Sequence, residues 1–114
     1  MKPMTARYAL MLGEDGMVKD DGIVCKINDQ HFITTTTTGG AANVLAHMEE
    51  YAQTEWPDMN VYMNSITEQF STFNISGPKA RTIMSRVFNT IDFSNDKFPF
   101  MTFNNFDYLN TQLE

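Results

Sequence analysis

Five consecutive threonines, Thr34–Thr38, end at a glycine pair and are followed at once by a pattern of helical period. Threonine is β-branched, and its stiff side chain favours an extended backbone, so His31–Thr38 is predicted to be a strand. In the next segment, apolar residues recur every three or four positions, at Ala41, Val44, Leu45, Met48, Tyr51 and Ala52. This spacing predicts an amphipathic helix that ends before Pro57. The chain must therefore change from strand to helix at Gly39-Gly40.

Short apolar runs separated by turn residues predict further strands on both sides of this helix. A hairpin is predicted where Ile23–Ile27 and His31–Thr37 flank Asn28-Asp29-Gln30. The Asp20-Asp21-Gly22 triplet has the composition of a solvated turn. The other predicted strands are Met17–Lys19, Val61–Thr67 and Phe70–Ser76, and a short apolar segment, Tyr8–Leu12, comes before them.

A second amphipathic helix is predicted after Gly77-Pro78, because Ala80, Ile83, Met84, Val87 and Phe88 form one apolar stripe. Strands and helices do not strictly alternate, so the fold class is α+β with a mainly antiparallel sheet and two amphipathic helices. The segment Ile91–Phe103 has no clear period. We expect a domain over residues 1–103, and we expect Asn104–Glu114 to be a loosely held tail.

Composition limits the classes of function. The net charge of −6 argues against a nucleic-acid partner, because such a surface needs an excess of basic residues. The one cysteine, Cys25, excludes an internal disulfide and a cysteine-rich zinc module, and a reducing cytoplasm is the expected location. His31 and His47 lack metal-ligand spacing, so no metal site is predicted. No apolar run is long enough to span a membrane.

Several segments, in order, resemble the α subunit of multi-subunit bacterial sarcosine oxidase. The resemblance covers about Arg7 to Phe103, in a region that is similar to the aminomethyltransferase (T-protein) of the glycine cleavage system and to dimethylglycine dehydrogenase. Beyond Phe103 the sequence no longer matches. The segments are Gly16–Gly22, His31–Ala42, Tyr51–Pro57, Ser65–Gln69, Ser76–Arg81 and Phe98–Phe103.

This resemblance implies a folate-binding region and a place in oxidative demethylation. Sarcosine oxidase oxidises sarcosine at a flavin held by another subunit, and tetrahydrofolate takes up the methyl-derived one-carbon unit, leaving glycine. The flavin and NAD sites of the family lie outside the matching region, and the other subunits are the implied partners. The chain alone is expected to be inactive. Two alternatives stay open: a truncated, non-catalytic remnant that self-associates, or an aminomethyltransferase-type folate protein.

The resemblance also implies two site residues. Asp21 is the second member of the family's paired acidic motif, which contacts the folate near its reacting nitrogens; a carboxylate there can hold an amine, accept a proton or stabilise an iminium cation. Thr37 stands where aminomethyltransferases place an asparagine, and its hydroxyl can hydrogen-bond a pterin edge. A second departure is Gly22, because aminomethyltransferases usually follow the acid with a bulky apolar residue. The threonine run favours the oxidase branch.

Overall fold

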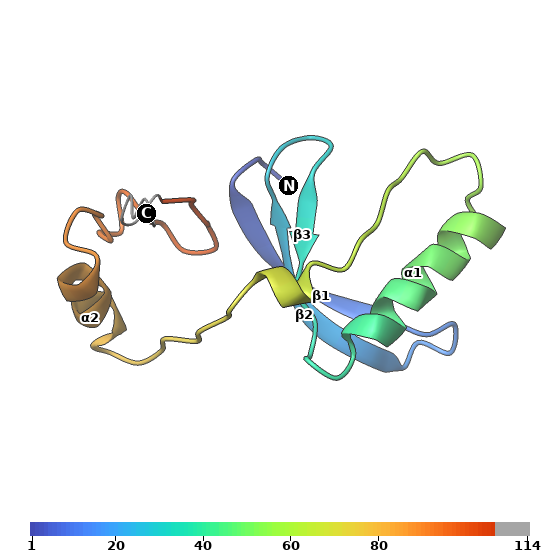
Figure 1. The fold of residues 1–114 in the computed structure, drawn as a ribbon, viewed down its shortest axis with the longest axis horizontal. Coiled ribbons are helices and arrows are strands. Elements are labelled where there is room, and N and C mark those ends of the chain that lie inside the picture. Colours follow the sequence, from blue (N-terminus) through green and yellow to red (C-terminus); the bar gives the residue numbers. More distant parts are fainter. Residues whose placement is uncertain (107–114) are drawn as a thin grey trace, which may run out of the picture.

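The computed structural model describes residues 1–106, so residues 107–114 of the predicted tail lie outside the described part. Its centre is an antiparallel sheet in the order β1-β2-β3, formed by β1 (Thr5–Leu12), β2 (Val18–Lys26) and β3 (Phe32–Thr34) (Figure 1). Two helices follow, α1 (Ala41–Thr54) and α2 (Ala80–Val87), with the short 3-10 helix η1 (Thr67–Gln69) between them. The predicted α+β class with an antiparallel sheet and two helices is confirmed.

Strand β2 is continuous through the acidic pair, so the prediction of a turn at Asp20-Asp21-Gly22 was wrong. The reversal lies earlier, between β1 and β2. There the Met17 N–H donates to Asp15 Oδ1 at 3.0 Å, and Gly16 adopts a φ of 77°. Because the chain reverses direction at this earlier turn, Asp21 and Gly22 lie within the strand and pair with Leu10 and Ala9.

The β2–β3 hairpin is confirmed, but its second strand is shorter than predicted. Main-chain pairing extends one residue past β3, where the Thr35 N–H donates to the Ile23 carbonyl at 2.9 Å. The threonine run then leaves the sheet, because Thr37 bonds to the side chain of Asp20 instead. A specific side-chain contact thus overrides the extended preference of β-branched residues.

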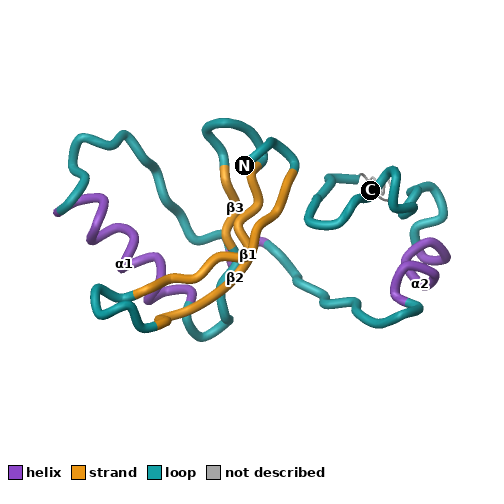
Figure 2. Tube along the Cα trace, turned by 180° about the vertical axis from the view of Figure 1, so that it is seen from behind, coloured by secondary structure: helices purple, strands orange, loops and turns teal. Residues whose placement is uncertain are grey.

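Helix α1 ends at Thr54, ahead of Pro57 as predicted, and lies against the β1–β2 hairpin (Figure 2). Its buried residue is Val44, which together with Ala6 forms the buried apolar set within residues 1–106. Two polar contacts tie the helix to the hairpin. Lys19 Nζ lies 3.2 Å from His47 Nδ1, and the Tyr51 hydroxyl donates to Glu14 Oε1 at 2.9 Å.

The predicted strands Val61–Thr67 and Phe70–Ser76 are absent from the described structure. A strand is stabilised by its ladder, and residues 1–106 offer these segments no paired neighbour. Beyond η1 the chain instead runs extended away from the sheet to α2 (Figure 1).

The part of the chain after α2 gathers around phenylalanine rings. Phe93 packs against Phe88, Phe98 and Phe106, with ring centroids between 5.8 and 6.4 Å apart. The chain then returns to the beginning of β1, where the Ala6 N–H donates to the Met101 carbonyl at 2.8 Å and Thr102 forms a bridge with Thr5.

Candidate functional site

The acidic pair at the centre of β2 divides its side chains between the two faces of the sheet. Successive residues of a strand point to opposite faces, so Asp20 and Asp21 cannot share one site. Asp20 pairs across the sheet with Met11 and lies on the face that α1 covers, whereas Asp21 pairs with Leu10 on the other face. The two carboxylates therefore serve separate purposes.

Asp20 has a structural role: its carboxylate binds the loop that follows β3. Its side chain is 7% exposed. Oδ1 accepts hydrogen bonds from the main-chain N–H groups of Asp21 at 2.7 Å and Thr37 at 3.1 Å, and Oδ2 accepts one from the Thr37 hydroxyl at 2.9 Å. Carboxylates that receive several such bonds are held in one orientation. Asp20 thereby fixes the loop that leads from β3 into α1.

The start of α1 is built around this carboxylate. Gly40, the N-cap residue, passes so close that a Cβ atom there would lie 1.7 Å from Asp20 Oδ2 and 2.7 Å from Thr37 Oγ1. Only glycine permits this approach. The negative charge also lies beside the positive end of the helix dipole, an arrangement that stabilises both.

These bonds predict how Asp20 contributes to acid stability. The Thr37 N–H, with the Asp21 N–H and the Thr37 hydroxyl, lowers the pKa of Asp20 below its usual value, against the opposing effect of burial. A lowered pKa in the folded state stabilises the fold above the unfolded pKa of about 3.9, and this contribution is lost as pH falls through the folded pKa. At pH 7 we expect Asp20→Asn to have a lower melting temperature than the wild type. This difference should disappear below about pH 4. Circular dichroism melts at a series of pH values measure the melting temperatures of the two proteins. A difference between them that does not depend on pH would contradict this role of the Asp20 carboxylate.

Asp21 lies half-buried on the opposite face, where the Tyr8 hydroxyl donates a hydrogen bond to Oδ2. That bond, reinforced by desolvation and by the carboxylate charge, raises the pKa of Tyr8. Within residues 1–106, no hydrogen bond is formed to Asp21 Oδ1. Around the pair the sheet face is open and apolar, since Tyr8 is 59% and Leu10 51% exposed. This face therefore presents a carboxylate with acceptor capacity in apolar surroundings.

Sequence reasoning missed Tyr8. The signal was present in the hairpin register: if the chain reverses at Gly13–Gly16, alternation places Tyr8, Leu10 and Asp21 on one face. The prediction of a turn at Asp20-Asp21-Gly22 concealed this register.

The structure brings Thr37 to Asp20, not to Asp21. Its hydroxyl is thus bonded within the fold, and Thr37 helps to hold the loop beside β2. The other departure from the aminomethyltransferase pattern, Gly22, also has a structural reason. A Cβ at Gly22 would lie 1.8 Å from the Thr35 carbonyl oxygen, so the threonine segment occupies the space of a side chain.

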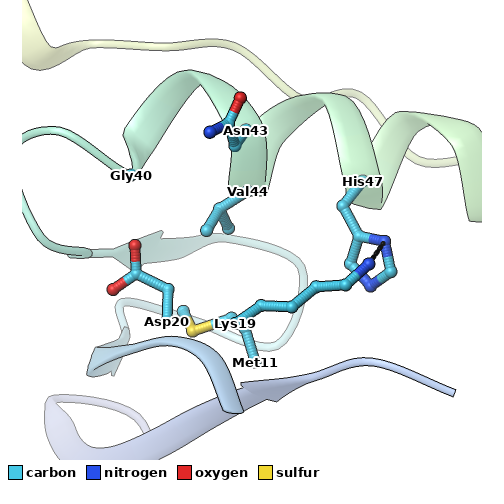
Figure 3. Close-up of a pocket in the computed structure, with 7 residues that line it drawn as sticks. All are labelled: Met11, Lys19, Asp20, Gly40, Asn43, Val44 and His47. Carbon is cyan, nitrogen blue, oxygen red and sulfur yellow. Dashed lines mark hydrogen bonds between the residues drawn. The ribbon is translucent and has the colours of Figure 1, made fainter. Parts of the chain in front are cut away.

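A cavity of about 320 Å³ lies between α1 and the sheet (Figure 3). Figure 3 shows the Asp20 carboxylate and the paired Lys19 and His47 side chains around the cavity. The cavity is lined by Met11, Lys19, Asp20, Gly40, Asn43, Val44 and His47.

Within the described residues, no three His, Cys, Asp or Glu side chains gather in a way that could hold a metal ion. In the same part of the chain, neither helix has the length and apolar character needed to cross a membrane.

Residues 1–113 match the GCVT N-terminal domain, and the chain belongs to this family. It is 45% identical over 103 residues to the sarcosine oxidase subunit alpha of Corynebacterium sp. (strain P-1), covering 90% of this chain and 11% of that protein. The subunit alpha of Rhizobium meliloti (strain 1021) is also 45% identical, over 96 residues, covering 84% and 10% of the two chains. An aminomethyltransferase of Chlorobium phaeovibrioides (strain DSM 265 / 1930) is 31% identical over 108 residues, covering 95% and 28%. The chain thus spans about a tenth of the length of its sarcosine oxidase relatives.

Proposed function

We propose that this chain forms part of the tetrahydrofolate-binding region of a sarcosine oxidase α subunit, with Asp21 as the residue that contacts the folate. The observation that carries the proposal is the Asp21–Tyr8 pair on the open sheet face, in a chain that is 45% identical to two sarcosine oxidase α subunits. When bound, tetrahydrofolate would take up the one-carbon unit derived from the methyl group of sarcosine.

The residues of this chain fit such a ligand. A reduced pterin presents N–H donors and a flat apolar ring, and Asp21 Oδ1 offers an acceptor beside the apolar side chain of Leu10. Tyr8 holds the other carboxylate oxygen and so fixes the direction of the acceptor. In this position Asp21 would orient the reacting amine, accept its proton and stabilise positive charge near it.

Asp20 and Thr37 support this arrangement from the other face. Because they fix the loop against β2, they limit movement of the strand that carries Asp21. Thr37 thus has a supporting role, and a direct contact between its hydroxyl and the folate, which the resemblance implies, would require exchange of its bond to Asp20. The flavin and NAD sites would lie in other parts of the oxidase, with a flavin-binding subunit as partner, in the cytoplasm.

The higher sequence identity to sarcosine oxidase α subunits favours the oxidase over an aminomethyltransferase. Gly22 supports the same choice, because the nearby Thr35 carbonyl leaves no room for a bulky residue after the acid. The competing candidate is a non-catalytic remnant. It is favoured by the wide exposure of the face around Asp21, where Tyr8 is 59% and Leu10 51% exposed.

Titration calorimetry with tetrahydrofolate separates the two candidates. We expect weak but saturable heat from the wild type and an affinity at least tenfold lower in Asp21→Asn, because a charge-assisted hydrogen bond contributes roughly 1.5–3 kcal/mol. Asp29→Asn is the matched control, since this carboxylate is 85% exposed and pairs with Lys26; it should bind like the wild type. Absence of heat from folded wild-type protein would favour the remnant, and equal loss in both variants would show that only overall charge matters.

A further inference from the structure

The Asp21–Tyr8 pair offers hydrogen-bond acceptors, and no donor, to a molecule that reaches it. The Tyr8 hydroxyl donates its hydrogen to Asp21 Oδ2, and within residues 1–106 Oδ1 has no partner. A phenol has one hydrogen to donate, so the Tyr8 oxygen can only accept from a third group while this bond is formed. An ionised carboxylate also only accepts. The pair therefore selects ligands by the hydrogens that they can donate.

The direction of the bond between Tyr8 and Asp21 is fixed at neutral pH. The hydrogen bond to Asp21, with desolvation and the negative charge of the carboxylate, raises the pKa of Tyr8 above its ordinary value of 10.0. The phenol therefore keeps its hydrogen throughout the neutral range and continues to donate it to Oδ2. Oδ1 is consequently the carboxylate oxygen that remains for a ligand.

The other side chains on this face of the sheet include no strong donor near the pair, within the described residues. The register of the three strands places Leu10, Ile23, Cys25 and Ile33 on the same face as Asp21. Three of these are apolar, and burial raises the pKa of the Cys25 thiol, which therefore stays a weak, neutral donor. Cys25 also lies about 13 Å along β2 from Asp21, given the rise of an extended strand. The acceptors of the pair thus lie in apolar surroundings.

Folates differ in the hydrogens that their two reacting nitrogens carry. In tetrahydrofolate each of these nitrogens carries one hydrogen and can donate it. In methylenetetrahydrofolate a CH₂ group joins the two nitrogens, and neither carries a hydrogen. An acceptor such as Asp21 Oδ1 has no partner on these nitrogens in the second form. A site built around a hydrogen bond binds an analogue that lacks the donor much more weakly, because its own polar group is left unpaired.

We propose that the Tyr8–Asp21 pair makes the site selective for folate before it receives the one-carbon unit, because Asp21 Oδ1 requires an N–H on a reacting nitrogen. Tyr8 is a positioning residue, since its hydroxyl determines which carboxylate oxygen is left for the ligand. This inference rests on the proposed function, in which Asp21 faces the reacting nitrogens. Its consequence is that methylenetetrahydrofolate leaves the site more readily than tetrahydrofolate.

Titration calorimetry with three folates tests this selectivity on the 114-residue protein. The ligands are tetrahydrofolate, methylenetetrahydrofolate and dideazatetrahydrofolate, in which carbon replaces both reacting nitrogens and no bridge is added. We expect tetrahydrofolate to bind at least tenfold more tightly than either of the other two, because only its reacting nitrogens can donate to Asp21. The dideaza analogue separates the loss of the hydrogens from the bulk of the methylene bridge.

Variants of the pair assign the selectivity to these two residues. In Asp21→Asn, the Tyr8 hydroxyl should donate to the amide oxygen and so turn the NH₂ group toward the ligand. The preference for tetrahydrofolate should then be lost or reversed. Combining Tyr8→Phe with Asp21→Asn lets the amide rotate, so part of the preference should return. Asp29→Asn is the matched control and should keep the full preference, since Asp29 pairs with Lys26 away from this site.

Each contrary result has a distinct meaning. Equal affinities for the three folates in the wild type would overturn the selectivity and leave the proposed folate site standing. A preference that persists unchanged in Asp21→Asn would assign its cause to another residue and so refute the role of the pair. Heat from none of the three ligands would contradict the proposed function and this inference with it. Circular dichroism verifies that each variant is folded, and the wild-type comparison does not depend on the variants.

Discussion

Replacing Gly22 with alanine is expected to lower the free energy of unfolding by about 3 kcal/mol, the upper end of the usual cost of overpacking. The added Cβ would lie 1.8 Å from the carbonyl oxygen of Thr35 and 2.7 Å from its carbonyl carbon. Main chain cannot rotate aside as a side chain can. Thr35 is moreover held by its N–H, which donates to the Ile23 carbonyl, and by its hydroxyl, which accepts from the Ile23 N–H at 2.9 Å. The strain must therefore separate β3 from β2 or displace the threonine loop.

Urea unfolding followed by circular dichroism measures this loss. Ile23→Val is a suitable comparison, because it changes the neighbouring residue at a cost of about 1 kcal/mol without bringing any atom closer to Thr35. Gly22→Leu introduces the kind of bulky apolar residue that aminomethyltransferases usually have after the acid. We expect this variant to be less stable than Gly22→Ala. Equal stability of the wild type and Gly22→Ala would show that Thr35 does not lie against β2 in solution.

The structure explains how far sequence reasoning could reach. The two helices and the β2–β3 hairpin depend on local periodicity and local turn chemistry, and these were predicted. The role of Asp20 depends on Thr37, seventeen residues away, and nothing in the local pattern of either residue indicates their contact. Local composition also gave a wrong prediction, because Asp20-Asp21-Gly22 is typical of a turn but lies in the middle of β2. Partners distant in sequence decide such cases.

The segments predicted as strands after α1 show a different limit. In Phe70–Ser76, apolar Phe73 and Ile75 alternate with polar residues, but alternation describes only what a segment can do when a neighbour is present. Within residues 1–106 no strand pairs with them, so the same residues are extended and exposed. The pattern therefore indicated a contact that the described chain does not contain.

The acidic pair shows how one strand can carry a structural residue and a candidate site residue side by side. Alternation places Asp20 beneath the start of α1 and Asp21 on the open face, so the first residue fixes the strand on which the second is presented. Tyr8 and Thr37 reinforce this division, since each hydroxyl donates to a different member of the pair. A variant that disturbs the Asp20 side should therefore weaken any binding at Asp21 as well.

Replacing Gly40 with alanine tests whether Gly40 packs against Asp20, and the change is expected to cost about 2 to 3 kcal/mol of unfolding free energy. The new Cβ would lie 1.7 Å from Asp20 Oδ2, and the carboxylate cannot move away without losing its bonds to Thr37. Gly39→Ala is the matched control: its neighbouring space is open, so the change should be neutral or slightly stabilising. The decisive comparison is the double variant Asp20→Ala with Gly40→Ala. Removing the carboxylate makes room for the new methyl group, so Gly40→Ala should cost far less in that background. Additive losses in a double-mutant cycle, measured by urea unfolding, would show that Gly40 does not lie against Asp20.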